Sequence, residues 1–197
     1  MDFIRDRKTA AQSARAIVAA RPLYLDCETT GLGSDAEICD IAVVDSDGSV
    51  ILSTLIRPTR PIPPEAEAIH GITNDMVNHA PLFGDVWPLL CRLFVGRPVV
   101  TYNAAYDSRL IQQSWAAIYG SVAAIANGHG RAITYTCAML LFSQFYGDWN
   151  DYRKAYKWQR LDVAAKCAGC PAWAAHRALG DTLATRAVVE WLAQQEV

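Results

Sequence analysis

Four carboxylates and one histidine, spread over three short stretches of the chain, are the residues whose types and spacing could do chemistry. Asp26 and Glu28 lie two residues apart at the end of an apolar run, Asp107 follows a second apolar run, and His176 precedes Asp181 by five residues. If these acids converge, each raises the pKa of the others. Two divalent cations would relieve that repulsion and create a centre for phosphoryl transfer.

In the first stretch, a pair of acids is followed by a small polar turn. Asp26 and Glu28 would share one face of an extended strand, because side chains at i and i+2 point to the same side. The following residues Thr29, Thr30 and Gly31 could offer backbone N–H groups to a phosphate or a terminal sugar, with Gly31 allowing an unusual turn. The alternative is a strand end with two solvated acids, and the pair alone does not decide between these interpretations.

The second and third stretches each place an acid near the start of a helix. Asp107 lies early in the helix that follows an apolar strand, and Asn103 is expected as its N-cap or as a turn residue. His176 and Asp181 are separated by roughly 500° on an ideal helix. They reach one centre only if His176 lies on a loop and Asp181 in the first helical turn. His176 could then take a proton from water, although each of these residues taken singly is more simply a surface residue.

The elements that must position these residues alternate between strands and helices. Strands are expected at 23–25, 37–45, 50–56, 98–102 and 132–135. Helices are expected at 1–20, 81–94, 104–119, 136–146, 159–168 and 176–195, with short helical turns within 65–79. Early strands followed by strand–helix alternation predict an α/β layered domain with a mixed sheet. Asp40 interrupts one of the apolar strands and has no role that the sequence assigns.

The bulk properties are those of an ordinary globular domain. The chain has 197 residues, a net charge of −2, and 52% hydrophobic and 19% charged residues. Binding to nucleic acid would therefore depend on local basic patches and metals. No secretory signal and no apolar run of transmembrane length is visible, which predicts a cytoplasmic protein without membrane contact. The six cysteines are accordingly expected to be reduced.

Taken together and in order, the three stretches resemble the motifs of the DEDD superfamily of 3′–5′ exonucleases, in its histidine-containing DEDDh branch. The first motif matches Asp26-Cys27-Glu28-Thr29-Thr30-Gly31, the second matches Asn103 with Tyr106-Asp107, and the third matches His176 and Asp181. The segment Ile69-His70-Gly71-Ile72-Thr73 is similar to one found between the first two motifs in many members. Tyr102 and Tyr106 stand where many relatives carry His and Phe, which leaves the substrate preference open.

The resemblance implies a ribonuclease H-like fold, with three α/β/α layers and a five-stranded mixed sheet. It divides the chain into an N-terminal helix over 1–21 and an exonuclease domain over 22–197. It also implies two Mg²⁺ or Mn²⁺ ions, which suit hard oxygen ligands. With His176 as general base, in-line attack would release nucleoside 5′-monophosphates from the 3′ ends of single-stranded DNA or RNA. The implied metal ligands are Asp26, Glu28, Asp107 and Asp181, and the implied substrate-binding residues are Thr29, Thr30, Gly31, Leu32, His70, Asn103 and Tyr106.

Several alternatives stay open at this point. A catalytically silent nucleic-acid-binding module of the same fold would have lost a ligand, yet all five expected residues are present; a metal phosphatase acting on nucleotides is the rival enzyme. His70 could equally be a turn histidine with a structural hydrogen bond, and Leu32 could wedge against a terminal base or belong to the core. Residues 142–160 interleave aromatic and basic side chains, which could guide a single strand or pack their rings inward on a helix. A homodimer, or a polymerase or repair partner, is also open, and the helix of 1–20 is a candidate contact.

Overall fold

One mixed sheet of five strands organises the protein. The computed structural model describes residues 2–120 and 133–196, and the strand order in the sheet is β3-β2-β1-β4-β5. The first three strands form an antiparallel meander, and β4 and β5 run parallel to β1. The strands are β1 (Leu23–Thr29), β2 (Ile38–Val44), β3 (Val50–Leu55), β4 (Val99–Thr101) and β5 (Tyr135–Cys137).

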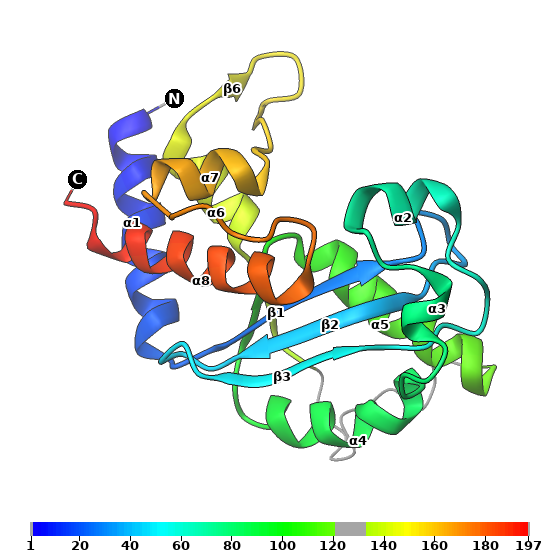
Figure 1. The fold of residues 1–197 in the computed structure, drawn as a ribbon. Helices are drawn as coiled ribbons and strands as arrows, with labels where there is room; N and C mark the ends of the chain where they lie inside the picture. Colours follow the sequence, from blue (N-terminus) through cyan, green and yellow to red (C-terminus); the bar gives the residue numbers. More distant parts are fainter. Residues whose placement is uncertain (1, 121–132, 197) are drawn as a thin grey trace.

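Helices cover both faces of this sheet, which confirms the expected α/β/α layers. On one face lie α1, α6, α7 and α8, and on the other α4 and α5, while α2 and α3 lie close to one end of the sheet (Figure 1). The helices are α1 (Phe3–Ala19), α2 (Pro64–His70), α3 (Asn74–Val77), α4 (Phe83–Phe94), α5 (Ala104–Tyr119), α6 (Ala138–Tyr146), α7 (Leu161–Cys167) and α8 (Ala178–Gln194). None of the helices in the described part of the chain is long and apolar enough to span a bilayer.

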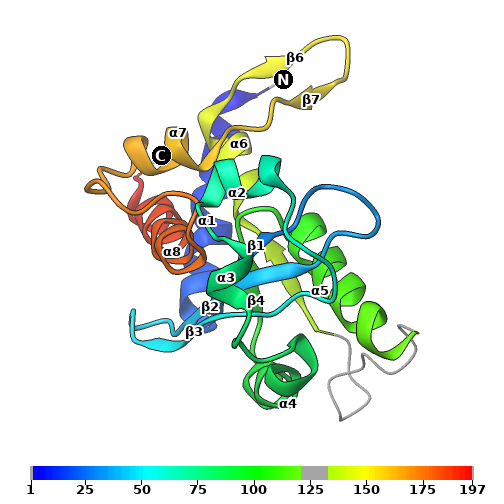
Figure 2. The same cartoon turned by 45° about the vertical axis from the view of Figure 1, so that its right-hand side comes forward.

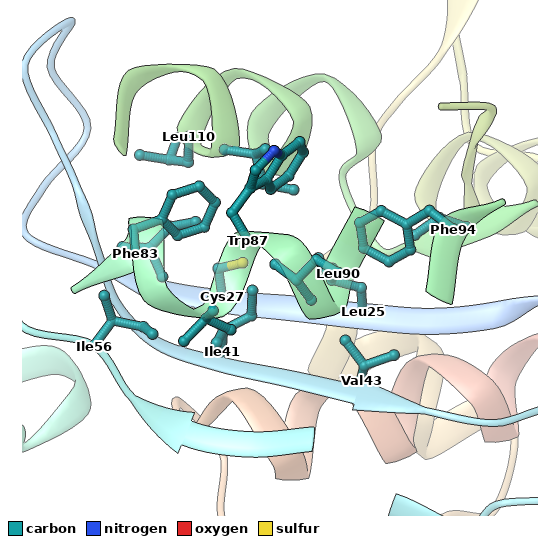
Figure 3. Packing of buried hydrophobic residues seen from close by; sticks show 14 of the residues in the cluster. Leu25, Cys27, Ile41, Val43, Ile56, Phe83, Trp87, Leu90, Phe94 and Leu110 are labelled. Carbon is teal, nitrogen blue, oxygen red and sulfur yellow. The ribbon is translucent and has the colours of Figure 1, made fainter. Parts of the chain in front are cut away.

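The alternation of side chains along β1 decides which way the first two acids point. Leu25 and Cys27 lie in the hydrophobic cluster under α4, together with Trp87 (Figure 3). Tyr24, one residue out of phase, belongs to the cluster on the α8 face. Because successive side chains of a strand alternate between faces, Asp26 and Glu28 continue the Tyr24 face. The two acids are therefore carried toward the start of α8.

The N-terminal helix packs on the body of the protein. Ala10, Ala11 and Ala14 are fully buried, and the Arg15 guanidinium donates to the carbonyl oxygens of Ala193 and Gln195 at 2.9 and 2.6 Å. The sequence allowed this helix either to contact a partner or to pack on the core. In the structure, α1 packs on α6 and α8. The division into a helix over 1–21 and a domain over 22–197 stays a prediction.

Between residues 133 and 160 the structure differs from the expected elements. The fifth strand occupies Tyr135–Cys137 rather than 132–135, and Ala132 lies outside the described residues. The helix expected at 136–146 is found as α6, and the residues after it, for which rings packed inward on a helix were one alternative, form a two-stranded hairpin of β6 (Trp149–Asn150) and β7 (Ala155–Tyr156). Strands of two or three residues are too short to show an alternating pattern, and the apolar run after Cys137 hides the boundary between strand and helix.

Candidate active site

The first two acids lie at the end of β1, where the strand pairing changes. Glu28 is paired with Asp40 of β2, and the register shifts before Thr29, which is paired with Ile38. Such a bulge re-aims side chains at a strand end. Asp26 and Glu28 are both partly buried, and Thr29 beyond them is buried.

Asp107 approaches the same place from the neighbouring strand. β4 is parallel to β1, with Val100 beside Tyr24, so the chain leaving β4 runs alongside the acidic end of β1. Asp107 lies in the first turn of α5 and is only 3% exposed. Its negative charge, after burial itself, is the largest influence that raises the pKa of Asp26 well above the ordinary value.

The third stretch adds a loop histidine and an acid in the first turn of α8. Glu28, His176 and Asp181 each offer an oxygen or nitrogen, and these atoms lie within 4.8 Å of one another. His176 is exposed and has a positive φ of 58°. The Asp181 carboxylate is fixed from both sides, because Trp173 Nε1 donates to one oxygen at 2.7 Å and the His176 backbone N–H donates to the other at 3.2 Å.

Burial, together with neighbouring carboxylates in the case of Asp26 and Glu28, raises the pKa values of these acids. Burial first, and then the charges of the other carboxylates, raise the pKa of Glu28 to about 7. Burial also raises the pKa of Asp107 to about 7, and raises the pKa of Asp181 above its ordinary value. A cluster that resists carrying its full negative charge near neutral pH is one that bound cations would relieve.

Another acid, the buried Asp40, contacts the residues that follow His176. Its carboxylate, 3% exposed, accepts a hydrogen bond from Arg177 Nε at 3.0 Å and a longer one from the Ala178 N–H at 3.4 Å. Asp40 faces Glu28 across the strand pair, and the guanidinium of Arg177 offsets part of the negative charge there. No role for Asp40 could be predicted from the sequence, because the contact joins residues 137 positions apart.

The polar turn after β1 is tied to α5. The Tyr106 hydroxyl lies 2.7 Å from Thr29 Oγ1 and 3.0 Å from the Gly31 carbonyl oxygen. The φ of Gly31, 154°, is one that residues with a Cβ rarely adopt. Arg109 lies over the Tyr106 ring and donates to the Leu32 and Gly33 carbonyl oxygens. Leu32 itself is 81% exposed, so the alternative in which it belongs to the core is wrong.

The other expected substrate-binding residues, His70, Thr30 and Asn103, differ in the hydrogen bonds that they form. His70 is buried, its Nδ1 accepts from the Ile72 N–H at 3.0 Å and its Nε2 lies 3.3 Å from the Thr29 carbonyl oxygen. These contacts favour the structural alternative for His70. Thr30 Oγ1 accepts from the Glu37 N–H and closes the turn between β1 and β2. Asn103 is the N-cap residue of α5, but its side chain forms no capping bond.

A cleft of about 740 Å³ opens over the third stretch. It contains His176 and Asp181, the predicted substrate residues Leu32 and Asn103, Trp158 of the aromatic and basic segment 142–160, and Trp173, which no motif had singled out. Trp173 lies eight positions before Asp181 in a loop without periodicity, so sequence spacing offered no signal for it. The full lining is Leu32, Tyr102, Asn103, Met139, Trp158, Gln159, Arg160, Leu161, Asp162, Trp173, Ala175, His176 and Asp181.

Comparison with known proteins places this geometry in a family. The family model described as exonuclease, of the ribonuclease T type, matches residues 23–189. An uncharacterized exonuclease of Escherichia phage 186, CP81, is 40% identical over 191 residues, which cover 94% of this chain and 95% of the phage protein.

Solved structures agree on the fold. Exonuclease X, in complex with 5′ overhanging duplex DNA, superposes with a TM-score of 0.60 and 28% identity, covering 86% of this chain and 89% of its own. Exonuclease I of E. coli, in complex with a dA16 oligonucleotide, has a TM-score of 0.69 at 19% identity and covers 88% of this chain and 41% of its own, a likeness of fold alone. The ribonuclease H-like fold is thereby confirmed, and the chain belongs to the exonuclease family as a DEDDh-type exonuclease.

Proposed function

We propose that this protein is a metal-dependent 3′–5′ exonuclease that removes nucleoside 5′-monophosphates from single-stranded 3′ ends. The observation that carries the proposal is the convergence of ligand atoms of Glu28, His176 and Asp181 within 4.8 Å, beside the partly buried Asp26, whose pKa is raised by burial and by the neighbouring Asp107. All five residues of the DEDDh motifs are present, which counts against a catalytically silent binding module.

The chemistry of the donor set fits hard divalent cations. The four acids supply only carboxylate oxygens, which are the ligands that Mg²⁺ and Mn²⁺ prefer. We expect Asp26, Glu28, Asp107 and Asp181 to hold two such ions. When bound, the ions would stabilise the charge that develops on the phosphoryl group and lower the pKa of the attacking water. The raised pKa values of Glu28 and Asp107 support this assignment, because bound cations would favour the deprotonated carboxylates.

The remaining steps are assigned to side chains of the chain itself. His176 accepts the proton of the attacking water, since its imidazole is exposed in the cleft and lies next to Glu28 and Asp181. Trp173 and the backbone of His176 keep the Asp181 carboxylate in one orientation. A general base commonly contributes about 10²- to 10⁴-fold to the rate.

The terminal nucleotide is expected to bind between the turn after β1 and the start of α5. Leu32, exposed at the mouth of the cleft, would lie against the terminal base, while Asn103 and the Thr29–Gly31 turn would meet the sugar and phosphate. Tyr106 supports that turn through its hydroxyl. His70 would support the turn indirectly, through the contact of its Nε2 with the Thr29 carbonyl oxygen.

The test is the digestion of matched single-stranded DNA and RNA, labelled at the 5′ end, with Mg²⁺, Mn²⁺ or EDTA. We expect stepwise shortening that requires the cation, and its loss in Asp26→Ala and Glu28→Ala variants that keep the far-ultraviolet circular dichroism of the wild type. Exposed Glu196→Gln serves as the matched control and should digest normally. Binding without shortening would favour the silent module, and attack only on mononucleotides would favour the phosphatase.

A further inference from the structure

The β6–β7 hairpin is an exposed projection with a firmly held base. It extends away from the sheet, beyond α6 and α7 and near the beginning of α1 (Figure 2). Trp149 and Tyr156 pack edge to face across its two strands, with ring centroids 5.2 Å apart. The Tyr156 hydroxyl donates to Asp6 of α1 at 2.6 Å. The hairpin is therefore fixed at its base and offers its side chains to solvent.

A groove on this hairpin meets the active-site cleft at one tryptophan. The groove has a volume of about 410 Å³ and is lined by Asn150, Arg153, Ala155, Tyr156, Lys157 and Trp158. Trp158 also lines the cleft that contains His176 and Asp181. It is 69% exposed although it is large and apolar. The two hollows therefore share the side chain of Trp158.

The charges along the hairpin groove suit a chain of phosphates. The groove lining contains two cations and no carboxylate. Arg153 forms no ion pair with any residue that the structure describes, and Lys157 pairs with Asp148 at 2.9 Å with both side chains about half exposed. Exposed pairs of this kind contribute little to stability, so Lys157 can exchange its partner for a phosphate.

We propose that the hairpin groove binds the unpaired strand on the 5′ side of the terminal nucleotide, with Trp158 stacked on a base where the groove meets the cleft. The proposal rests on the proposed exonuclease function and adds the path of the substrate. An aromatic face beside cations is the combination that holds single strands without reading their sequence. It also explains why Trp158 stays exposed rather than packing against α7.

The test compares groove residues with matched residues at the hairpin tip. Trp158→Ala and Arg153→Glu alter the groove. Tyr152→Ala and Lys154→Glu alter an aromatic and a cation outside its lining, Tyr152 being 95% exposed. Binding of a fluorescent 12-nucleotide single strand is measured by anisotropy in EDTA, and turnover is measured on oligonucleotides of 2 to 12 nucleotides.

We expect Trp158→Ala to weaken binding of the 12-mer roughly 5- to 100-fold and to raise KM for long substrates more than for dinucleotides. Arg153→Glu should also lower the dependence of binding on salt, by a slope of about 0.7 for one lost phosphate contact. The tip variants should behave as wild type. A blunt duplex, whose bases are paired, should bind wild type and Trp158→Ala equally.

If both groove variants bound the single strand as tightly as the wild type, the groove proposal would be overturned. Cleavage by the wild type would in that case still support the exonuclease function. If the groove variants lost affinity for a polyglutamate peptide to the same extent as for the single strand, the groove would bind acidic chains in general. That result would also overturn the proposal. If the wild type cleaved nothing, the proposed function would fall, and the anisotropy comparison would still decide whether the groove binds a strand.

Discussion

Replacing Glu28 by Gln should stabilise the metal-free protein, and the gain should depend on pH. Burial and neighbouring acids raise the pKa of Glu28 from 4.5 to about 7. Between these values the folded protein keeps a proton that the unfolded chain has released, so the wild type loses stability as pH rises, and above about 7 the whole penalty applies. At about 1.4 kcal/mol per pH unit the difference amounts to about 3 kcal/mol. Partial solvent access to Glu28 reduces the expected gain to about 1–3 kcal/mol.

Urea unfolding in EDTA at pH 5 and pH 8 measures this effect. The free energy of unfolding of Glu28→Gln should exceed that of the wild type by about 1–3 kcal/mol at pH 8 and by a small fraction of that at pH 5. Glu196→Gln, which removes an exposed carboxylate, should show no such difference. Mg²⁺ should then stabilise the wild type more than the variant. A Glu28→Gln protein that is less stable than wild type at pH 8 would refute the idea that the acids repel one another.

Three further changes test the surroundings of the site. His176→Ala should lower kcat by about 10²- to 10⁴-fold with little change in KM, and an unaffected rate at neutral pH would exclude His176 as the general base. Trp173→Phe removes the N–H that holds Asp181, so the Mg²⁺ concentration for half-maximal activity should rise about 10- to 100-fold; an unchanged requirement would show that this hydrogen bond does not position the ligand. A Cβ at Gly180 would collide with the Ala174 carbonyl oxygen, so Gly180→Ala should displace the loop of Trp173 and His176 and reduce kcat at least about tenfold, and wild-type kcat in a folded variant would contradict that reasoning.

The parts of the site that follow local rules could be predicted from the sequence. The period of a strand places Asp26 and Glu28 on one face, and the structure has them on the same face as Tyr24, away from the α4 cluster. The angular separation of His176 and Asp181 on a helix required a loop followed by a first turn, which is the arrangement found. Both conclusions depend only on the geometry of one element.

Contacts between distant elements could not be predicted in the same way. Asp40 lies opposite Glu28 only because of the register of β1 and β2, and its partner Arg177 comes from the other end of the chain. Trp173 reaches Asp181 from an irregular loop. For His70 the residue type allowed two roles, and only the positions of Thr29 and Ile72 around its ring favour the supporting one.

The aromatic and basic segment shows a third kind of limit. Its composition allowed either rings exposed as a guiding surface or rings buried on a helix, and the structure contains both exposed and buried rings in different parts of the segment. Phe142 is fully buried in α6, whereas Tyr152 and Trp158 are exposed on and after the hairpin. Composition indicates which side chains are present, but the chain reversal after Tyr146 decides which of them face solvent.

The central claim, that distant acids converge to hold two divalent cations, is tested most directly by calorimetric titration of Mn²⁺ into the protein with thymidine 5′-monophosphate present. The account predicts uptake of two ions per chain by the wild type, and loss of that uptake in an Asp26→Asn/Asp181→Asn double variant with unchanged circular dichroism. No uptake by the wild type, or equal uptake by the double variant, would contradict it.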